Sequence, residues 1–536
     1  MVKFNTHIKG ITKTVNHEGA EAYKPSQKLE LMLRTMSFMM NGDAYYTTEK
    51  ETSGAIASLV KSISTTDPQY VLNLAVFARE EMYLRSVPVF LLVEYAKTGA
   101  KLPGAYKYVP KILQRADEPA EALSYLFASA KRSPESDEKR RHTLKMAGKP
   151  VTERTTAPIP KMLKRGIAET LNKFDAYQLA KYNREGSVTL KDVLLLTHPK
   201  PKSEEQQEIF DKIVAGTLEP PFTWEVVIST KGSTKETWES VIPKMGYMAT
   251  LRNLRNLVEK GVDLDPVIAR LTNPIAVANS KQFPYRFFSA YKALAYGPCF
   301  SFSYNHPKND APTKLLDALN VAMDLSVANV DNIPGKTFVA TDNSGSMNDS
   351  IETQYGNRTR LRSTRSNISR IDVASLLSAI SLHICDEAKV GAFANVYTTV
   401  PLSKKSTILD NMQKIRNTSV GGATNAWLAI DHIIRKEEFY DRIFLFSDMQ
   451  CYNSYEYSDN YESDLASCVR EYRKKINPKC RLYSFDMSSY GLLKFPEHDP
   501  LTCPLSGYSD AIFRFVPMFE QDKTTMLKSI ESYKPL

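Results

Sequence analysis

The stretch Phe338-Val-Ala-Thr-Asp342-Asn-Ser344-Gly-Ser346-Met347 decides the fold of the second half of this chain. It opens as a short apolar run typical of a buried strand and ends in an aspartate followed by spaced serines. Similar apolar runs recur at 390–396, 443–446 and 482–485, separated by helical segments such as 372–388. Buried strands that alternate with helices of about 10–15 residues predict βαβ units and a parallel sheet. We therefore expect residues 331–536 to form a doubly wound α/β domain.

Oxygen-bearing side chains follow three of the expected strands. Asp342, Ser344 and Ser346 follow the first strand, Thr424 lies in the Gly-Gly-Ala-Thr-Asn loop 421–425, and Asp448 ends the strand at 443–446. The carboxyl ends of strands in an open α/β sheet are where ligand crevices form. Two carboxylates and three hydroxyls make an all-oxygen donor set, which suits Mg²⁺ or another hard divalent cation. We predict a metal site at this edge.

Two other interpretations of these residues were considered. In the simpler one, the serines and aspartates only cap helices in a structural domain. A phosphatase of the haloacid-dehalogenase type also begins with a strand and an aspartate, but it needs a second acid two residues later, where this chain has Ser344. The sequence contains no G-x-x-x-x-G-K-[ST] phosphate-binding loop. The domain is therefore expected to bind a ligand rather than to catalyse a reaction.

The first part of the chain, residues 1–330, has a helical apolar spacing almost throughout. Ile56, Leu59, Val60 and Ile63 illustrate the i, i+3, i+4, i+7 pattern. The expected helices are short, are separated by Pro or Gly turns and recur in pairs without an exact sequence repeat. Helix pairs of this kind bury their faces by stacking on their neighbours, as in α-solenoids. We expect an all-α, repeat-like module.

Positive charge is concentrated in the helical module. The chain has 536 residues, 70 Lys+Arg and 60 Asp+Glu, for a formal net charge of +10. Residues 301–536 are almost balanced, with 27 basic and 28 acidic side chains, whereas residues 101–200 alone hold 20 basic and 11 acidic ones. Such a concentration indicates a polyanionic partner, although a solvated, Lys-rich helix surface would give the same count.

The basic segment contains a helix with two distinct faces. Between residues 161 and 171, the spacing places Lys161, Lys164 and Arg165 on one face, opposite an apolar stripe of Leu163, Ile167 and Leu171. Cationic side chains in such an array form salt-dependent contacts with phosphates. Nearby tyrosines could stack on bases, namely Tyr106, Tyr108, Tyr177 and Tyr182. The candidate RNA-binding residues are Lys131, Arg132, Arg140, Lys161, Lys164, Arg165, His198 and Lys200.

The cysteines and the apolar runs bear on the cellular environment. The six cysteines are irregularly spaced and form no C-x-x-C pair, which disfavours a zinc knuckle or a disulfide framework. The longest apolar run, 87–93, is far shorter than the roughly 18 residues that span a bilayer, and the N-terminus has no apolar signal region. We expect a cytoplasmic protein that does not associate with membranes.

Several segments together resemble the Ro autoantigen family, in which a TROVE module precedes a von Willebrand factor A domain. The metal motif itself resembles the metal-ion-dependent adhesion site of such A domains, and the order of the two modules is the same. The segments that carry the resemblance are 34–46, 161–171, 191–201, 238–256 and 470–475. The resemblance assigns Asp342, Ser344, Ser346, Thr424 and Asp448 as direct or water-mediated metal ligands.

The resemblance also implies an architecture and a function. In such proteins the TROVE helices form a HEAT-like ring that the A domain closes. Ends of misfolded RNAs enter the central hole, and small noncoding Y RNAs bind the basic outer surface. The implied role is RNA quality control without catalysis by the protein, which would be a monomer, with a 3′ exoribonuclease as a possible partner. Family members carry Trp-Ser-His where this chain has Val188-Thr189-Leu190, so a contact from that histidine is not expected.

Two further functions are left open by the residues themselves. One is a metal-dependent protein-interaction scaffold whose basic helices are merely solvated and bind no RNA. The other is a metal phosphohydrolase that depends on Asp342.

Overall fold

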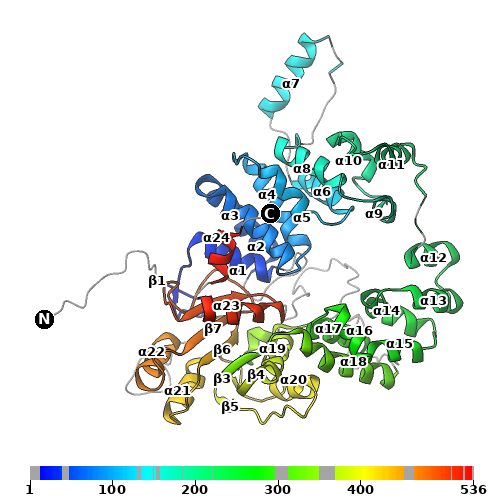
Figure 1. Cartoon of the computed structure of the whole chain (residues 1–536). Helices are drawn as coiled ribbons and strands as arrows, with labels where there is room; N and C mark the ends of the chain where they lie inside the picture. Colours follow the sequence, from blue (N-terminus) through cyan, green and yellow to red (C-terminus); the bar gives the residue numbers. More distant parts are fainter. Residues whose placement is uncertain are drawn as a thin grey trace. The chain divides into compact units, whose positions relative to one another are not determined.

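The computed structural model describes residues 13–38, 47–129, 134–148, 150–151, 157–183, 185–219, 221, 223–295, 312–348, 368–451, 464–508, 510–522 and 525–533 (Figure 1). The chain divides into two compact units, one of Met1–Gly54 with Lys231–Ser529 and the other of Ala55–Thr230 with Ile530–Leu536. Among the described helices, none combines the length and the apolar character needed to cross a membrane.

The second unit, called here the helical unit, is built from short helices that pack in pairs. α3 contacts α4, α4 contacts α6, and α8 contacts α5, α6 and α10. The helices of this unit are α2 (Glu49–Thr66, shared with the first unit), α3 (Pro68–Glu80), α4 (Ser86–Thr98), η1 (Ala105–Tyr108), α5 (Val109–Ile112), α6 (Glu118–Ser129), α7 (Pro134–Met146), α8 (Lys161–Leu171), α9 (Ala176–Tyr182), α10 (Leu190–Thr197), α11 (Glu204–Ala215) and α12 (Trp224–Lys231).

A buried ion pair joins three elements of the helical unit. The Glu118 side chain, at the start of α6, is 0% exposed and lies 2.7 Å from Arg79 of α3. Its other oxygen accepts hydrogen bonds from the backbone N–H groups of Gln114 and Arg115. Arg85, which precedes α4, lies 3.4 Å from the same carboxylate. Both carboxylate oxygens of Glu118 thus have protein partners in a place that water does not reach.

The first unit, called here the A-domain unit, contains two strands and several helices besides the α/β domain. They are β1 (Lys13–Val15), β2 (Glu21–Tyr23), α1 (Gln27–Ser37), α13 (Lys235–Val241), η2 (Ile242–Lys244), α14 (Tyr247–Glu259), α15 (Asp265–Leu271), α16 (Pro274–Ser280), α17 (Pro284–Ala295), α18 (Thr313–Ser326) and η3 (Val327–Asn329). The α/β domain follows with β3 (Ile333–Asp342), η4 (Gly345–Asn348), α19 (Arg370–Ile384), β4 (Cys385–Phe393), β5 (Tyr397–Thr399), α20 (Ile408–Arg416), α21 (Trp427–Arg435), β6 (Arg442–Ser447), α22 (Leu465–Lys475), β7 (Arg481–Asp486), β8 (Thr502–Ser506), η5 (Asp510–Arg514) and α23 (Phe515–Asp522). α24 (Met526–Ser532) crosses from this unit into the helical one.

The described strands of the α/β domain form one sheet in the order β5-β4-β3-β6-β7-β8. All neighbouring pairs are parallel except β4 with β5. The chain passes from β3 to β4 on one side and later returns to β6 on the other side of β3. This reversal of strand order makes the carboxyl ends of β3 and β6 the switch point of the sheet, where α/β proteins bind ligands.

Alternate residues of the strands contact two different sets of helices. Phe338 of β3 and Leu445 of β6 belong to an apolar core shared with α21 and α22. On the opposite face, Thr341 of β3 forms a hydrogen bond of 2.7 Å with Ser378 of α19, and the ring of Phe444 packs on Phe513 of η5. Both faces of the central strands are therefore buried, which explains their continuous apolar runs.

The last helices before the α/β domain are tied to it by charged groups. Lys292 of α17 lies 3.0 Å from Asp372 of α19, and Arg416 of α20 lies 2.7 Å from the same carboxylate. The Lys292 ammonium and the Arg416 guanidinium, together with a backbone hydrogen bond at Ser369, oppose the effect of burial and lower the pKa of Asp372. Asp372 thus links α17 to α19 and α20 of the α/β domain.

A second buried carboxylate caps the start of α17. Asp510 Oδ2 accepts a hydrogen bond of 3.0 Å from the backbone N–H of Tyr285, while Oδ1 has no partner among the described residues. Burial raises the pKa of Asp510 to about 7. Because the ordinary aspartate pKa is about 3.9, the folded state binds this proton more tightly than the unfolded state does.

An Asp510→Asn variant is therefore expected to alter the pH dependence of stability. In the native protein, the contribution of Asp510 is fully present below about pH 4 and is lost, at about 1.4 kcal/mol per pH unit, as the pH rises toward about 7. Asparagine keeps an acceptor for Tyr285 but carries no proton to lose. Urea unfolding at pH 4, 5.5 and 7.5 measures the difference between the two proteins, and parallel pH profiles would contradict this role.

Candidate metal centre and nucleic-acid interface

The predicted metal ligands lie together at the switch point of the sheet. Asp342 ends β3, and Asp448 follows β6, the strand that pairs with β3 in parallel. Ser344 and Ser346 lie in and beside the 3₁₀ turn η4, and their hydroxyl oxygens are 3.4 Å apart. All five predicted donors, Asp342, Ser344, Ser346, Thr424 and Asp448, are buried, with exposures between 0 and 8%.

Backbone contacts bring the glycine loop with Thr424 to the same place. The backbone N–H of Gly345 donates to the Gly422 carbonyl over 3.0 Å, which joins this loop to the turn after β3. The Asn395 side chain accepts hydrogen bonds from Gly422 and Ala423 at 2.6 and 2.8 Å. Gly421 has a φ of +97°, and a Cβ there would lie 2.2 Å from Asn395, so this approach requires glycine.

The two carboxylates are held in different ways. Asp342 accepts hydrogen bonds from the Ser344 backbone N–H at 2.9 Å and from the Ser447 hydroxyl at 2.5 Å. Asp448 Oδ1 accepts one from the backbone N–H of Gln450 at 3.1 Å, while its Oδ2 is buried without a partner among the described residues. An unpartnered carboxylate oxygen is costly in a buried place unless a further group binds it.

The electrostatics of the pair favour a cation. Burial, reinforced by the negative charge of Asp448, raises the pKa of Asp342. Burial also raises the pKa of Asp448, against the opposing effect of the nearby Ser346 hydroxyl. Two carboxylates and three hydroxyls fit Mg²⁺, which takes few protein ligands and keeps several waters. Among the described residues, no group of three or more His, Cys, Asp or Glu side chains could hold a metal ion.

Sequence reasoning missed three residues that shape this edge. Ser447 binds the Asp342 carboxylate, and Asn395 holds the glycine loop. The Asn343 amide donates to the carbonyl oxygens of Ile415 at 2.8 Å and Thr418 at 3.2 Å, which anchors the turn after β3 to the end of α20. Ser447 and Asn343 each stand next to a predicted ligand, and that adjacency was the available signal.

The basic helix has the two faces that its spacing predicted. Leu163, Ile167 and Leu171 of α8 are 0% exposed, whereas Lys161 is exposed and the Arg165 side chain is 60% exposed. Lys164 is partly exposed. Gly166 lets α8 approach η1 and α5 closely, because a Cβ there would lie 2.3 Å from Val109.

Two of the predicted interface residues lie near the other end of α8. The Asn172 side chain, at the C-cap of α8, donates to the Lys200 carbonyl over 2.7 Å. His198 is exposed and ends α10 in the left-handed conformation, with a φ of 52° that is uncommon for a residue other than glycine. The backbone of Lys200 thus lies beside Asn172, which is about two helical turns from Arg165 along α8.

Other predicted contacts have a different status. Arg140 lies on α7, whereas Lys131 and Arg132 lie outside the described residues. Tyr106 supports Arg165, whose guanidinium carbon lies 3.4 Å from the centre of the ring. Arg165 also donates to Glu169 at 3.2 Å, so its orientation is set before any ligand binds. Tyr108 is buried and donates to Asn73, which makes it a core residue rather than a base-stacking one.

Family models match most of the chain. The TROVE domain matches residues 19–219 and 207–296, and the Ro60 vWA domain matches residues 336–519. The chain belongs to the Ro family of TROVE-domain proteins. This assignment confirms the resemblance inferred from the sequence, together with the order of an α-helical part and an A-type α/β domain.

The chain is also similar to individual known proteins. The chain resembles the crystal structure of the Deinococcus radiodurans RO (RSR) protein, with a TM-score of 0.60 at 16% identity, covering 93% of this chain and 100% of the other. It is 21% identical over 351 residues to telomerase protein component 1 of Rattus norvegicus, and 24% over 326 residues to that of Mus musculus. Those matches cover 50% and 45% of this chain but only 13% and 12% of the telomerase components.

Proposed function

We propose that this Ro-family chain is an RNA-binding protein of a ribonucleoprotein that acts in RNA quality control. Membership of the family supports RNA binding in general. The RNA-binding site is proposed from the two faces of α8. Lys161, Lys164 and Arg165 project from its surface, and the opposite face is fully buried. Cations on a rigid, well-packed helix contact phosphates without a large loss of side-chain order.

The finer assignments rest on the family resemblance. Small noncoding, Y-like RNAs would bind the basic outer surface, and single-stranded ends of misfolded RNAs would enter the hole of a helical ring. A 3′ exoribonuclease is the partner that such a function calls for, and the protein would act as a monomer in the cytoplasm. The described cysteines are buried free thiols, which is typical of proteins from reducing compartments.

We further propose that the edge formed by Asp342, Ser344, Ser346, Thr424 and Asp448 holds Mg²⁺. The support is the buried, unpartnered Oδ2 of Asp448 next to a second buried carboxylate. The cation would neutralise both charges and would offer an open coordination position to an incoming oxygen ligand. A metal-dependent protein-interaction scaffold that binds no RNA is the alternative function that this edge favours.

Replacing Lys161, Lys164 and Arg165 together by alanine is expected to weaken RNA binding. Gel-shift titrations with a structured RNA bearing a 3′ single-stranded tail, at several salt concentrations, measure both affinity and its salt dependence. Each lost phosphate contact lowers the slope of log K against log salt by about 0.7–0.9. Three contacts would therefore lower that slope by about two, with a larger loss of affinity at low salt.

A matched control separates these contacts from net charge. Alanine at Lys235, Lys405 and Lys475, which are exposed lysines of the A-domain unit, removes the same three charges elsewhere. This control should retain nearly all of the affinity and the slope. Equal effects of the two triple variants would refute a specific interface on α8, and the absence of RNA binding in both and in the native chain would favour the scaffold function.

A further inference from the structure

The donors of the metal edge are almost inaccessible. Asp342, Ser344 and Asp448 are 0% exposed, and Ser346 and Thr424 are 8% and 4% exposed. Part of the chain must therefore move before a ligand larger than water reaches this edge. The candidate for such a movement is a described segment that contacts this edge but is distant from it in sequence.

The hairpin of β1 and β2 is that segment, and Asn16 organises it. The Asn16 side chain is 5% exposed, and its Oδ1 accepts hydrogen bonds from the backbone N–H groups of Glu18 at 3.1 Å and Ala20 at 2.8 Å. Its Nδ2 donates to the Cys451 carbonyl over 2.9 Å. One side chain thus shapes the turn of the hairpin and attaches that turn to the A domain.

The attachment point is the loop that follows the ligand Asp448. The backbone N–H of His17 donates to Gln450 Oε1 over 3.0 Å, and the backbone N–H of Gln450 donates to Asp448 Oδ1 over 3.1 Å. Between them, Met449 has a φ of 61° and is 3% exposed. A buried side chain in this strained conformation persists only where its surroundings enforce it. The hairpin and the ligand loop are therefore mechanically connected.

We propose that the turn of the β1–β2 hairpin, residues 16–19, is a built-in cover of the metal edge, with Asn16 as its latch. When the latch is closed, the turn holds residues 449–451 against the sheet and restricts passage of the metal and of its ligands. When the latch opens, the loop after Asp448 relaxes and the edge becomes accessible. This inference rests on the metal assignment made under Proposed function.

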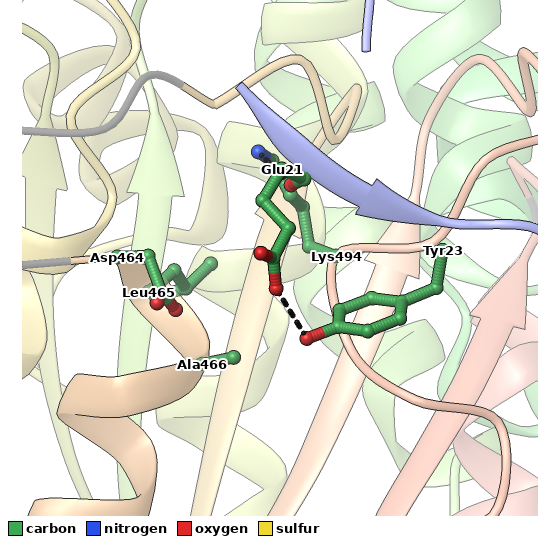
Figure 2. A pocket seen from close by; sticks show the side chains of 6 residues that line it. All are labelled: Glu21, Tyr23, Asp464, Leu465, Ala466 and Lys494. Carbon is green, nitrogen blue, oxygen red and sulfur yellow. Dashed lines mark hydrogen bonds between the residues drawn. The ribbon is translucent and has the colours of Figure 1, made fainter. Parts of the chain in front are cut away.

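The remainder of the N-terminal segment would keep the opened turn in place. Tyr23 exchanges two backbone hydrogen bonds with Leu493, of 2.8 and 2.9 Å, and the Lys494 ammonium donates to the Glu21 carbonyl over 2.9 Å. Figure 2 shows this base, where Glu21 accepts a hydrogen bond from Tyr23 beside the start of α22. A hairpin that is anchored at its base and latched at its tip can open without leaving the domain.

Charge at the tip supports the same arrangement. Glu18 follows His17, whose backbone N–H donates to Gln450 two residues after Asp448, and the backbone N–H of Glu18 donates to Asn16 Oδ1. Glu18 is therefore close enough to act electrostatically on the metal edge, where it would attract a cation and repel an acidic ligand. Closing the latch thus places one more negative charge beside the site.

The test uses the full chain and Mn²⁺ as the probe. Asn16→Ala removes the latch, Glu18→Gln removes only the charge, and Lys13→Ala, an exposed residue paired with Glu21 on the same hairpin, is the matched control. Hydrogen exchange at the amides of His17, Glu18 and Ala20 reports latch opening without any metal. The rate at which excess EDTA removes bound Mn²⁺ reports access to the edge.

Asn16→Ala is expected to speed both amide exchange and Mn²⁺ removal by about tenfold or more, since three hydrogen bonds are lost. Glu18→Gln is expected to weaken Mn²⁺ binding a few-fold with unchanged amide exchange, and this result remains decisive if Asn16→Ala does not fold. Lys13→Ala should match the native chain. Faster amide exchange with an unchanged Mn²⁺ removal rate would overturn the cover while leaving the metal site intact. No Mn²⁺ binding by the native chain would instead overturn the metal assignment and the cover with it.

Discussion

A Glu118→Ala variant is expected to lose about 3–5 kcal/mol of stability in the helical unit, because it leaves the buried charge of Arg79 without an acidic partner. The Arg79 side chain is only 9% exposed, so water cannot replace the lost carboxylate. The backbone N–H groups of Gln114 and Arg115 would lose their acceptor as well. Urea unfolding followed by the helical circular dichroism signal measures the change in midpoint.

The control for Glu118 is a carboxylate in an exposed ion pair of the same unit. Glu169, 42% exposed and paired with Arg165 one helical turn away, should lose no more than about 0.5 kcal/mol on replacement by alanine. Glu118→Gln should resemble Glu118→Ala more than the native chain, since it restores an acceptor but not the charge. A midpoint shift for Glu118→Ala as small as that of Glu169→Ala would show that the buried pair contributes little.

An Asp342→Asn variant is expected to abolish Mg²⁺ binding while the protein stays folded. Asparagine still accepts a hydrogen bond from the Ser344 backbone N–H but cannot supply the second negative charge beside Asp448. In the native chain, Mg²⁺ at one hundred times its Kd would add about 2.7 kcal/mol of stability. Calorimetric titration and thermal unfolding, with and without Mg²⁺, measure both effects.

The sign of the effect without metal provides a separate check. In EDTA at neutral pH, two buried carboxylates repel each other, so Asp342→Asn should be at least as stable as the native chain. Asp410→Ala, an exposed carboxylate at the start of α20, should bind Mg²⁺ normally. Equal Mg²⁺ heats from the native chain and Asp342→Asn would exclude this edge as the metal site.

Periodicity predicted the elements whose side chains face one environment along their length. The apolar stripe of α8 is buried, as its spacing predicted. A helix with 3.6 residues per turn places Leu163, Ile167 and Leu171 on one face, so packing that face removes all three from water. The central strands β3, β6 and β7 were found because both of their faces are buried, which gives unbroken apolar runs.

Boundaries and edge strands were less predictable. The helix expected at 372–388 ends at Ile384, and β4 begins at the next residue. The early positions Asp386 and Glu387 are exposed, so the first half of this strand carries no apolar run. The edge strands β5 and β8 and the helix α20 were missed. The three residues of β5 are mostly exposed and carry no apolar run. The extended conformation of these three residues depends on pairing with β4 rather than on their own composition.

The sequence by itself determined the order of the two parts, the α/β class of the second, the five oxygen-bearing side chains that we propose as metal ligands, and the cationic face of α8. These features follow from the spacing of residues along the chain. The regular backbone of a helix or strand fixes which residues share a face, so this spacing predicts where their side chains lie. Only the tertiary structure decided three contacts. Asn16 donates a hydrogen bond to the Cys451 carbonyl, Glu118 pairs with Arg79, and Asp510 caps α17. The two residues of each pair lie far apart in the chain. They need each other as hydrogen-bond or charge partners only because folding removes both from water, so local sequence patterns do not reveal the pairing.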